Sequence, residues 1–140
     1  MPDRPQPFTH RFRTRYAEVD MQKVVFNGRY LEYADLLITE FWREIDLHFT
    51  GDNSLEFHTV RAAIDYVAPI RADEWIDGRV WTEKVGNTSV TTHMELHGAT
   101  GDGSDDLRAR IELVHVHVDL ESGRPMPVPD WARPLLLAEK

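Results

Sequence analysis

A chain of 140 residues in which 41% of the residues are hydrophobic and the formal net charge is −8 is expected to form one globular domain over residues 1–140. The absence of cysteine excludes disulfides, thiol nucleophiles and thiolate metal sites, and the negative charge argues against nucleic acid as a partner. No apolar run approaches the ~20 residues that cross a bilayer, and the start does not resemble a signal peptide. We therefore expect a cytoplasmic protein without membrane partners.

The first strand is expected after a loose, proline-rich segment over residues 1–7. From Phe8 to Tyr16 apolar and polar residues alternate, as in a strand with one buried face. The arginines at positions 11, 13 and 15 share the polar face and are interpreted as a solvated or subunit-facing row.

The strongest helical pattern runs from Tyr30 to Ile45, where apolar residues recur at i, i+3, i+4 and i+7. Asn27, whose side chain is suited to accept bonds from free helix amides, and the permissive Gly28 mark its start. Asp20 stands shortly upstream. Because free amides at a helix start can polarise a carbonyl that a carboxylate then attacks or hydrates, this spacing suggests catalysis. The alternative is that Asp20 is only a solvated loop acid.

The second half of the chain is expected to be mostly strands. Alternation from Val60 to Ala68 predicts a half-buried strand, which Pro69 ends because proline cannot donate to a ladder. The runs over residues 75–85 and 89–97 flank the short loop Gly86-Asn87-Thr88 and predict an antiparallel hairpin.

The last strand is expected from Leu107 onward, after a polar loop over residues 98–106 to which no chemistry is assigned. Its apolar residues change phase after Leu113, which predicts a bulge or a strand covered on different faces. Spaced prolines then predict an extended exit into a tail over residues 131–140. The order of elements predicts an α+β fold in which an antiparallel β-sheet of about five strands wraps one long central helix.

Three stretches carry a family resemblance. They are R-Y-A-E-V-D-M-Q-K-V-V-F-N-G-R-Y-L-E-Y from Arg15, Y-V-A-P-I-R-A-D-E from Tyr66, and G-R-P-M-P-V-P from Gly123. Together they resemble the hotdog-fold acyl-CoA thioesterases of the 4-hydroxybenzoyl-CoA thioesterase type, from Phe8 to about Pro134. The resemblance implies a hotdog fold and hydrolysis of an acyl- or aroyl-CoA thioester to the free acid and coenzyme A, without metal or organic cofactor.

The resemblance also implies roles for particular residues. Asp20 matches the catalytic carboxylate, a nucleophile or general base, and the backbone amide near Asn27 matches the donor that polarises the thioester carbonyl. Tyr16 matches an active-site tyrosine of one branch of the family. Two positions depart from the pattern: Lys23 stands where glycine is usual, and Asn27 where one branch has histidine. Glycine at position 23 would allow a backbone conformation that is costly for lysine. A lysine side chain near Asp20 would also favour the charged form of the Asp20 carboxylate.

Coenzyme A needs cations and polar donors for its phosphates. Each residue that could supply them is, alternatively, a solvated surface residue. The candidates for substrate binding are Lys23, Gly28, Arg61, Arg71, Lys84, Arg124, Asn87, Thr88 and Ser89.

Other chemistries are weaker alternatives. A non-catalytic acyl-thioester binding module would follow if Lys23 marks decay of the catalytic loop, and a hydratase is disfavoured because no histidine and carboxylate pair stands on the helix. His115 with His117, and His93 with His97, share strand faces, but no third metal ligand is fixed by spacing, so these are read as surface histidines. The sequence contains no G-x-S-x-G elbow, so a serine hydrolase of the familiar type is disfavoured.

The expected assembly follows from the single sheet. One sheet buries only one side of the helix and leaves strand edges open, which predicts a homodimer joined edge to edge, or a homotetramer built from such dimers. The site would then lie at the subunit boundary.

Overall fold

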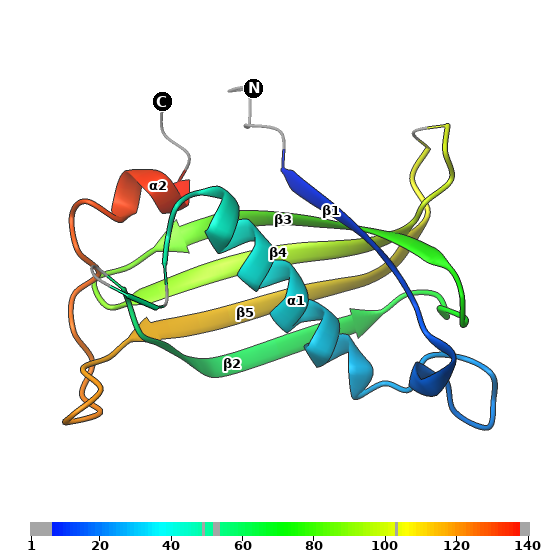
Figure 1. Cartoon of the computed structure of the whole chain (residues 1–140), viewed down its shortest axis with the longest axis horizontal. Coiled ribbons are helices and arrows are strands. Elements are labelled where there is room, and N and C mark those ends of the chain that lie inside the picture. Colours follow the sequence, from blue (N-terminus) through cyan, green and yellow to red (C-terminus); the bar gives the residue numbers. More distant parts are fainter. Residues whose placement is uncertain (1–6, 49, 52–53, 103, 138–140) are drawn as a thin grey trace.

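The computed structural model describes residues 7–48, 50–51, 54–102 and 104–137. They form a five-stranded antiparallel sheet, in the order β1-β3-β4-β5-β2, curved around one long helix (Figure 1). This confirms the predicted architecture. The predicted loose segment, residues 1–7, lies outside the described residues except for Pro7. In chain order the elements are β1 (Phe8–Arg13), the 3-10 helix η1 (Tyr16–Glu18), α1 (Arg29–Glu44), β2 (Phe57–Tyr66), β3 (Trp75–Val85), β4 (Ser89–Gly98), β5 (Leu107–His117) and α2 (Arg133–Leu137).

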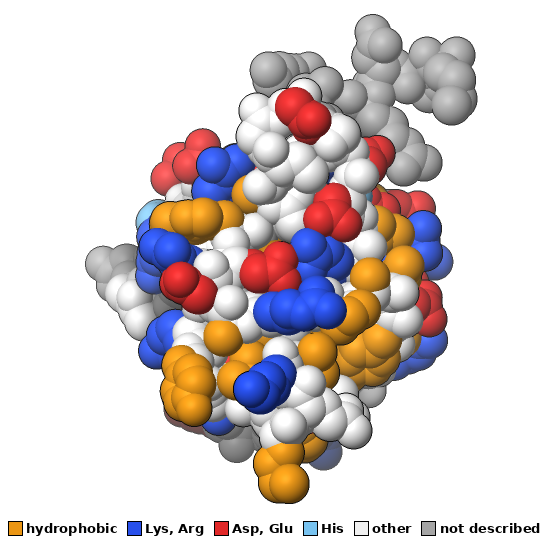
Figure 2. Space-filling model, turned by 90° about the vertical axis from the view of Figure 1, so that its right-hand side faces the viewer, with side chains coloured by type: hydrophobic (Ala, Val, Ile, Leu, Met, Phe, Trp, Pro, Cys, Tyr) orange, Lys and Arg blue, Asp and Glu red, His pale blue; other side chains and the backbone are white. Residues whose placement is uncertain are grey.

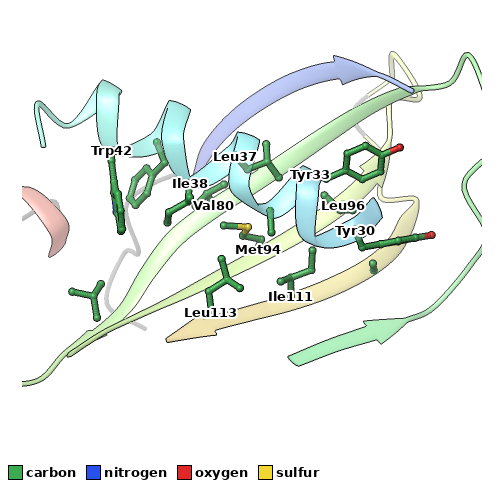
Figure 3. Packing of buried hydrophobic residues seen from close by; sticks show 14 of the residues in the cluster. Tyr30, Tyr33, Leu37, Ile38, Trp42, Val80, Met94, Leu96, Ile111 and Leu113 are labelled. Carbon is green, nitrogen blue, oxygen red and sulfur yellow. The ribbon is translucent and has the colours of Figure 1, made fainter. Parts of the chain in front are cut away.

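Helix α1 lies on the sheet with the predicted apolar face inward (Figure 3). Its central contact is Leu37, which is fully buried above Gly78 of β3. A Cβ at Gly78 would come within 2.5 Å of both Leu37 Cδ atoms, so glycine is needed for the helix to approach this closely. The buried residues of the helix are Tyr30, Tyr33, Ala34, Leu37, Ile38, Phe41 and Trp42.

Strand β1 is shorter than predicted, because it ends at Arg13 and Tyr16 begins η1 instead. The chain leaves the sheet where the Thr14 hydroxyl donates to the Arg71 carbonyl and the Arg15 amide donates to the Glu18 carboxylate, at 2.5 and 2.7 Å. Local polar contacts therefore replace the ladder at this point.

The phase change predicted in the last strand is wrong. Strand β5 continues its alternation through His115 and His117, which occupy the inner face and are buried. The apolar run appeared out of phase because Val114 and Val116 cover the outer face, where they are only partly exposed. The β2–β5 ladder does shift register at this point, between Val114 and His115, but the extra residue is Val60 of β2 and not a residue of β5.

Strand β2 is less covered than the predicted half-buried strand. It lies at the edge of the sheet, pairs only with β5 among the described strands, and has a register shift after Thr59. Val60 and Tyr66 are consequently 59% and 53% exposed in the single chain.

The segment after residue 131, predicted as a tail, contains α2. Pro134 stands in its first turn, where a missing amide costs no helix bond, and Leu136 is buried. The backbone amide of Val128 donates to the Asn87 carbonyl at 2.8 Å, which ties this segment to the β3–β4 hairpin. None of the helices described is long and apolar enough to cross a membrane.

Candidate active site

The segment before α1 folds into a small closed loop that carries Asp20. A bridge between Val19 and Val25 closes the loop, and inside it the Asp20 amide donates to the Val24 carbonyl at 3.0 Å. The Lys23 amide donates back to the Asp20 carbonyl at 2.9 Å, which makes a tight turn. The carboxylate of Asp20 accepts the Gln22 amide with Oδ1 at 2.8 Å. The loop therefore fixes the carboxylate and leaves it partly exposed.

Lys23 has a left-handed backbone, with φ 64°. A hairpin loop that ends a tight turn with one left-handed residue favours glycine there, because a Cβ raises the energy of that conformation. The geometry accounts for the glycine that the resemblance leads one to expect at this position. The Lys23 side chain is exposed.

Free amides lie at the start of α1, just after this loop. Among the hydrogen bonds of the described residues, none has the amide of Asn27 or Gly28 as donor. Gly28 is the N-cap, and no side chain caps the helix, so the predicted capping role of the Asn27 side chain is wrong. Instead, the Phe26 carbonyl accepts the Arg29 amide at 2.9 Å. The two uncapped amides remain available to a ligand at the positive end of the helix.

Tyr16 stands in η1 and is 87% exposed. Within the described residues its hydroxyl makes no hydrogen bond, so the single chain leaves it free above the loop region rather than fixed against Asp20.

Glu18 is a residue of this region that sequence reasoning missed. Its carboxylate is buried and accepts hydrogen bonds from the Arg15 amide at 2.7 Å and from the Tyr33 hydroxyl at 2.9 Å. Burial by itself would raise the pKa of Glu18, but these bonds and the Arg15 guanidinium outweigh it and hold the pKa below its usual value. Burial and the neighbouring carboxylate raise the pKa of Tyr33. The pair ties the Asp20 loop to α1. The only sequence signal for this role of Glu18 is that a charged residue stands two positions before Asp20.

Arg71 is the one predicted cation beyond the loop that lies at this end of the molecule. The preceding residue, Ile70, accepts the Val25 amide at 2.7 Å, which brings the segment against the loop. Figure 2 views this end of the molecule and shows Lys and Arg side chains near the centre of the face, with Asp and Glu side chains next to them and hydrophobic side chains around them. Several cations of this end pair with carboxylates, as Arg13 does with Asp73 and Arg108 with Glu74. Arg71 forms no ion pair within the described residues and is therefore available to an anionic ligand.

The other predicted binding residues lie elsewhere in the single chain. Arg61 is paired with Glu112 on the outer face of the sheet, where it lines a hollow of about 370 Å³. Lys84 and the loop Asn87-Thr88-Ser89 lie at the β3–β4 hairpin, at the opposite end of the sheet from the start of α1 (Figure 1). There the Thr88 carbonyl accepts the His117 amide at 2.8 Å, a structural role. Arg124 is exposed, beyond β5.

Three of the four strand histidines, His97, His115 and His117, are buried, so their prediction as surface residues is wrong, whereas His93 is partly exposed. His115 is buried with its ring 5.1 Å from that of Trp42, and burial lowers the pKa of His115 to about 4. His117 is also buried, and its Nδ1 lies 3.0 Å from the Pro127 carbonyl. His93 contacts Glu112 on the outer face. In the described parts of the chain no group of three or more His, Asp or Glu side chains is placed to hold a metal ion.

Comparison with known proteins places this geometry in a family. A protein of Pseudomonas aeruginosa strain PAO1 has the same fold, with a TM-score of 0.82, 26% identity and 96% of each chain covered. A 1,4-dihydroxy-2-naphthoyl-CoA thioesterase from Synechocystis has a TM-score of 0.80, 18% identity and coverage of 92% of this chain and 94% of that one. A mutant 4-hydroxybenzoyl-CoA thioesterase, complexed with 4-hydroxybenzoyl-CoA, has a TM-score of 0.84, 13% identity and coverage of 94% and 99%.

No curated protein sequence matches the chain. The sequence model of the thioesterase-like superfamily, however, matches residues 14–136, which include the Asp20 loop, α1 and every strand of the sheet except β1. The chain therefore belongs to the thioesterase-like superfamily and has the hotdog fold.

Proposed function

We propose that this chain is an acyl-CoA thioesterase, which hydrolyses an acyl- or aroyl-CoA thioester to the free acid and coenzyme A. The observation that carries the proposal is a carboxylate fixed by its own loop, Asp20, in the segment that leads directly into two uncapped amides, those of Asn27 and Gly28, at the positive end of α1. Family membership supports the reaction class.

In the proposed reaction the thioester carbonyl oxygen accepts a hydrogen bond from one or both free amides. Asp20 then either attacks the carbonyl carbon or takes a proton from a water that attacks it. Negative charge develops on the carbonyl oxygen, where the amides and the helix dipole stabilise it. The C–S bond breaks, the thiolate of coenzyme A leaves and is protonated, and the acid is released. An acyl-Asp20 anhydride, if formed, is hydrolysed by a second step. No metal or organic cofactor takes part in this scheme.

Substrate binding is proposed to use the cations of this end, Lys23 and Arg71, for the coenzyme A phosphates, with Gly28 beside the thioester and Tyr16 covering it. Arg61, Lys84 and the Asn87-Thr88-Ser89 loop lie away from this end in one chain, so they would contact substrate only if a second subunit brings them there.

A homodimer would supply that second subunit. The edge strand β2, with the exposed side chains of Val60 and Tyr66 and of Val67 just after it, supports edge-to-edge pairing, because an open edge and exposed apolar side chains together favour association. Sedimentation at micromolar concentration should give a dimer or tetramer; a fully active monomer would contradict this arrangement.

A panel of aromatic, short, medium and long acyl-CoAs, with free thiol measured directly, tests the function. Turnover of any member supports the enzyme and identifies its acyl group. A non-catalytic binding module is the second candidate, because Lys23 strains the loop where glycine is usual. Binding of acyl-CoA in calorimetry without thiol release from any member would favour the module.

A further inference from the structure

One of the two free amides is held in place by a side chain from the far edge of the sheet. The Tyr66 hydroxyl, at the end of β2, donates to the Asn27 carbonyl at 3.0 Å. The Tyr66 ring packs edge-on against Tyr30, with centroids 4.8 Å apart and planes at 77°. Tyr30 is buried in the first turn of α1, so the ring pair fixes where the Tyr66 hydroxyl lies.

We propose that Tyr66 is a positioning residue for thioester hydrolysis: it holds the Asn27–Gly28 peptide so that the Gly28 amide points out of the helix start toward the substrate carbonyl. The carbonyl and amide of one trans peptide point in opposite directions, so fixing the Asn27 carbonyl also fixes the Gly28 amide. A hydrogen bond to the carbonyl also polarises that peptide and strengthens its amide as a donor. The inference rests on the proposed function.

The neighbouring peptide shows why a side chain is needed here. The Phe26–Asn27 peptide, which carries the other free amide, is held by a backbone bond of 2.9 Å from Arg29 to the Phe26 carbonyl. The backbone bond to the Asn27 carbonyl comes from the Tyr30 amide and is longer, 3.4 Å. The shorter bond from Tyr66 is thus the stronger constraint on the Gly28 amide, whereas the Asn27 amide does not depend on it.

The kinetic test uses Tyr66→Phe, which removes the hydroxyl and keeps the ring against Tyr30. We expect kcat for the best acyl-CoA to fall about fivefold, the effect of one hydrogen bond of typical net strength, with KM changed less than twofold. Tyr30→Phe is the matched comparison, since it removes a hydroxyl from the same ring pair but leaves the bond from Tyr66 to Asn27; its kcat should fall clearly less than that of Tyr66→Phe. A parental kcat in Tyr66→Phe, with the parent active, overturns the inference.

A second measurement does not need activity. Relaxation of backbone 15N nuclei should show greater motion of the Gly28 amide in Tyr66→Phe and no change at the Asn27 amide. Equal loosening of both amides, with a lower melting temperature, would mean that Tyr66 only stabilises the fold. If the parent turns over no acyl-CoA, the proposed function fails; selective loosening of Gly28 would still support the tether, and an unchanged Gly28 amide would overturn it.

Discussion

The two ends of α1 are built on different principles. At its C-terminal end Trp42 packs against Phe57 and His115, with ring centroids 5.0 and 5.1 Å apart, and His117 lies 5.4 Å from Phe57. At its N-terminal end the chain carries a left-handed lysine, two amides without partners among the described residues, and the exposed apolar side chains of Met21 and Phe26. Aromatic rings pack near both ends, as Tyr30 does with Tyr66 at the N-terminal end, but only the N-terminal end leaves polar backbone amides exposed at the helix terminus.

The difference separates the part of the molecule that stabilises the fold from the part that holds the candidate reactive groups. Aromatic rings buried together stabilise a domain strongly, whereas uncapped amides and left-handed backbone lower stability and persist where they serve a ligand. The comparison predicts that substitutions at the C-terminal end of α1 change mainly folding and those at the N-terminal end mainly turnover.

The largest effect is expected from Trp42→Ala at the packed end. Loss of this buried ring should lower the free energy of unfolding by about 3–5 kcal/mol, because transfer and cavity terms add. Urea denaturation measures it, and kcat of the folded fraction should stay within about twofold of the parent. Trp131→Ala, which truncates a tryptophan that is 47% exposed, is the control and should cost much less. Equal losses in both variants would contradict the difference in packing.

His115 should make this end sensitive to acid. Its folded-state pKa is lowered to about 4 by burial, opposed weakly by Asp35, whereas the unfolded value is near 6.5. Below pH 6.5 the unfolded state therefore binds a proton that the folded state does not, and stability falls as the pH drops toward 4. The contribution at stake is about 3 kcal/mol, from the two pKa values.

The measurement is the free energy of unfolding from pH 8 to pH 4, compared with His115→Leu. The variant lacks the titrating ring, so its stability should fall less over the window from 6.5 to 4. Acid loss due to Glu18, whose pKa is lowered, occurs in both proteins and cancels in the comparison. Identical pH profiles would show that His115 charges freely in the folded state.

At the other end, Asp20→Asn should reduce turnover by about a hundredfold or more, which corresponds to about 2.7 kcal/mol in the activation free energy. Asparagine keeps an oxygen for the Gln22 amide but lacks the charge and basicity that either mechanism needs. Acyl-CoA binding and thermal stability should change little. Asp46→Asn, at an exposed carboxylate beyond the C-terminal end of α1, is the control and should turn over at the parental rate. Parental turnover in Asp20→Asn would make Asp20 only a loop acid.

The smallest effect concerns Lys23. Lys23→Gly should raise the free energy of unfolding by about 0.5–1 kcal/mol, because relief of the left-handed strain exceeds the added freedom of the unfolded chain. Lys23→Ala keeps the strain and should show no such gain in urea denaturation. A destabilised Lys23→Gly would contradict both the backbone geometry and the resemblance at this position.

Lys23→Met separates charge from strain at the same position. If the amine meets a phosphate of coenzyme A, KM should rise in this variant at low ionic strength, and the difference should shrink in high salt. An unchanged KM at both salt concentrations would remove Lys23 from the proposed binding residues.

The sequence by itself determined the elements that depend on local pattern. The 3.6-residue period over Tyr30 to Trp42 correctly predicted the buried face of α1, and the alternation around Gly86-Asn87-Thr88 correctly predicted the β3–β4 hairpin. The position of Asp20 shortly before the helix start was likewise readable, since both features lie in one short stretch. Local spacing and turn chemistry act between residues near in the chain, so one sequence is enough to show them.

Only the tertiary structure decided which distant residues share the site. The Tyr33 hydroxyl reaches Glu18, and that of Tyr66 reaches across from β2 to Asn27, contacts that depend on strand order and on how α1 lies over the sheet. The same arrangement leaves Lys84 at the opposite end and turns His115 inward, against the expectations from sequence. The resemblance already indicated that the backbone at position 23 is costly for lysine, and the closed loop shows the reason, a left-handed φ of 64°. Contacts between segments far apart in the chain are selected by packing of the whole domain, which no local pattern encodes.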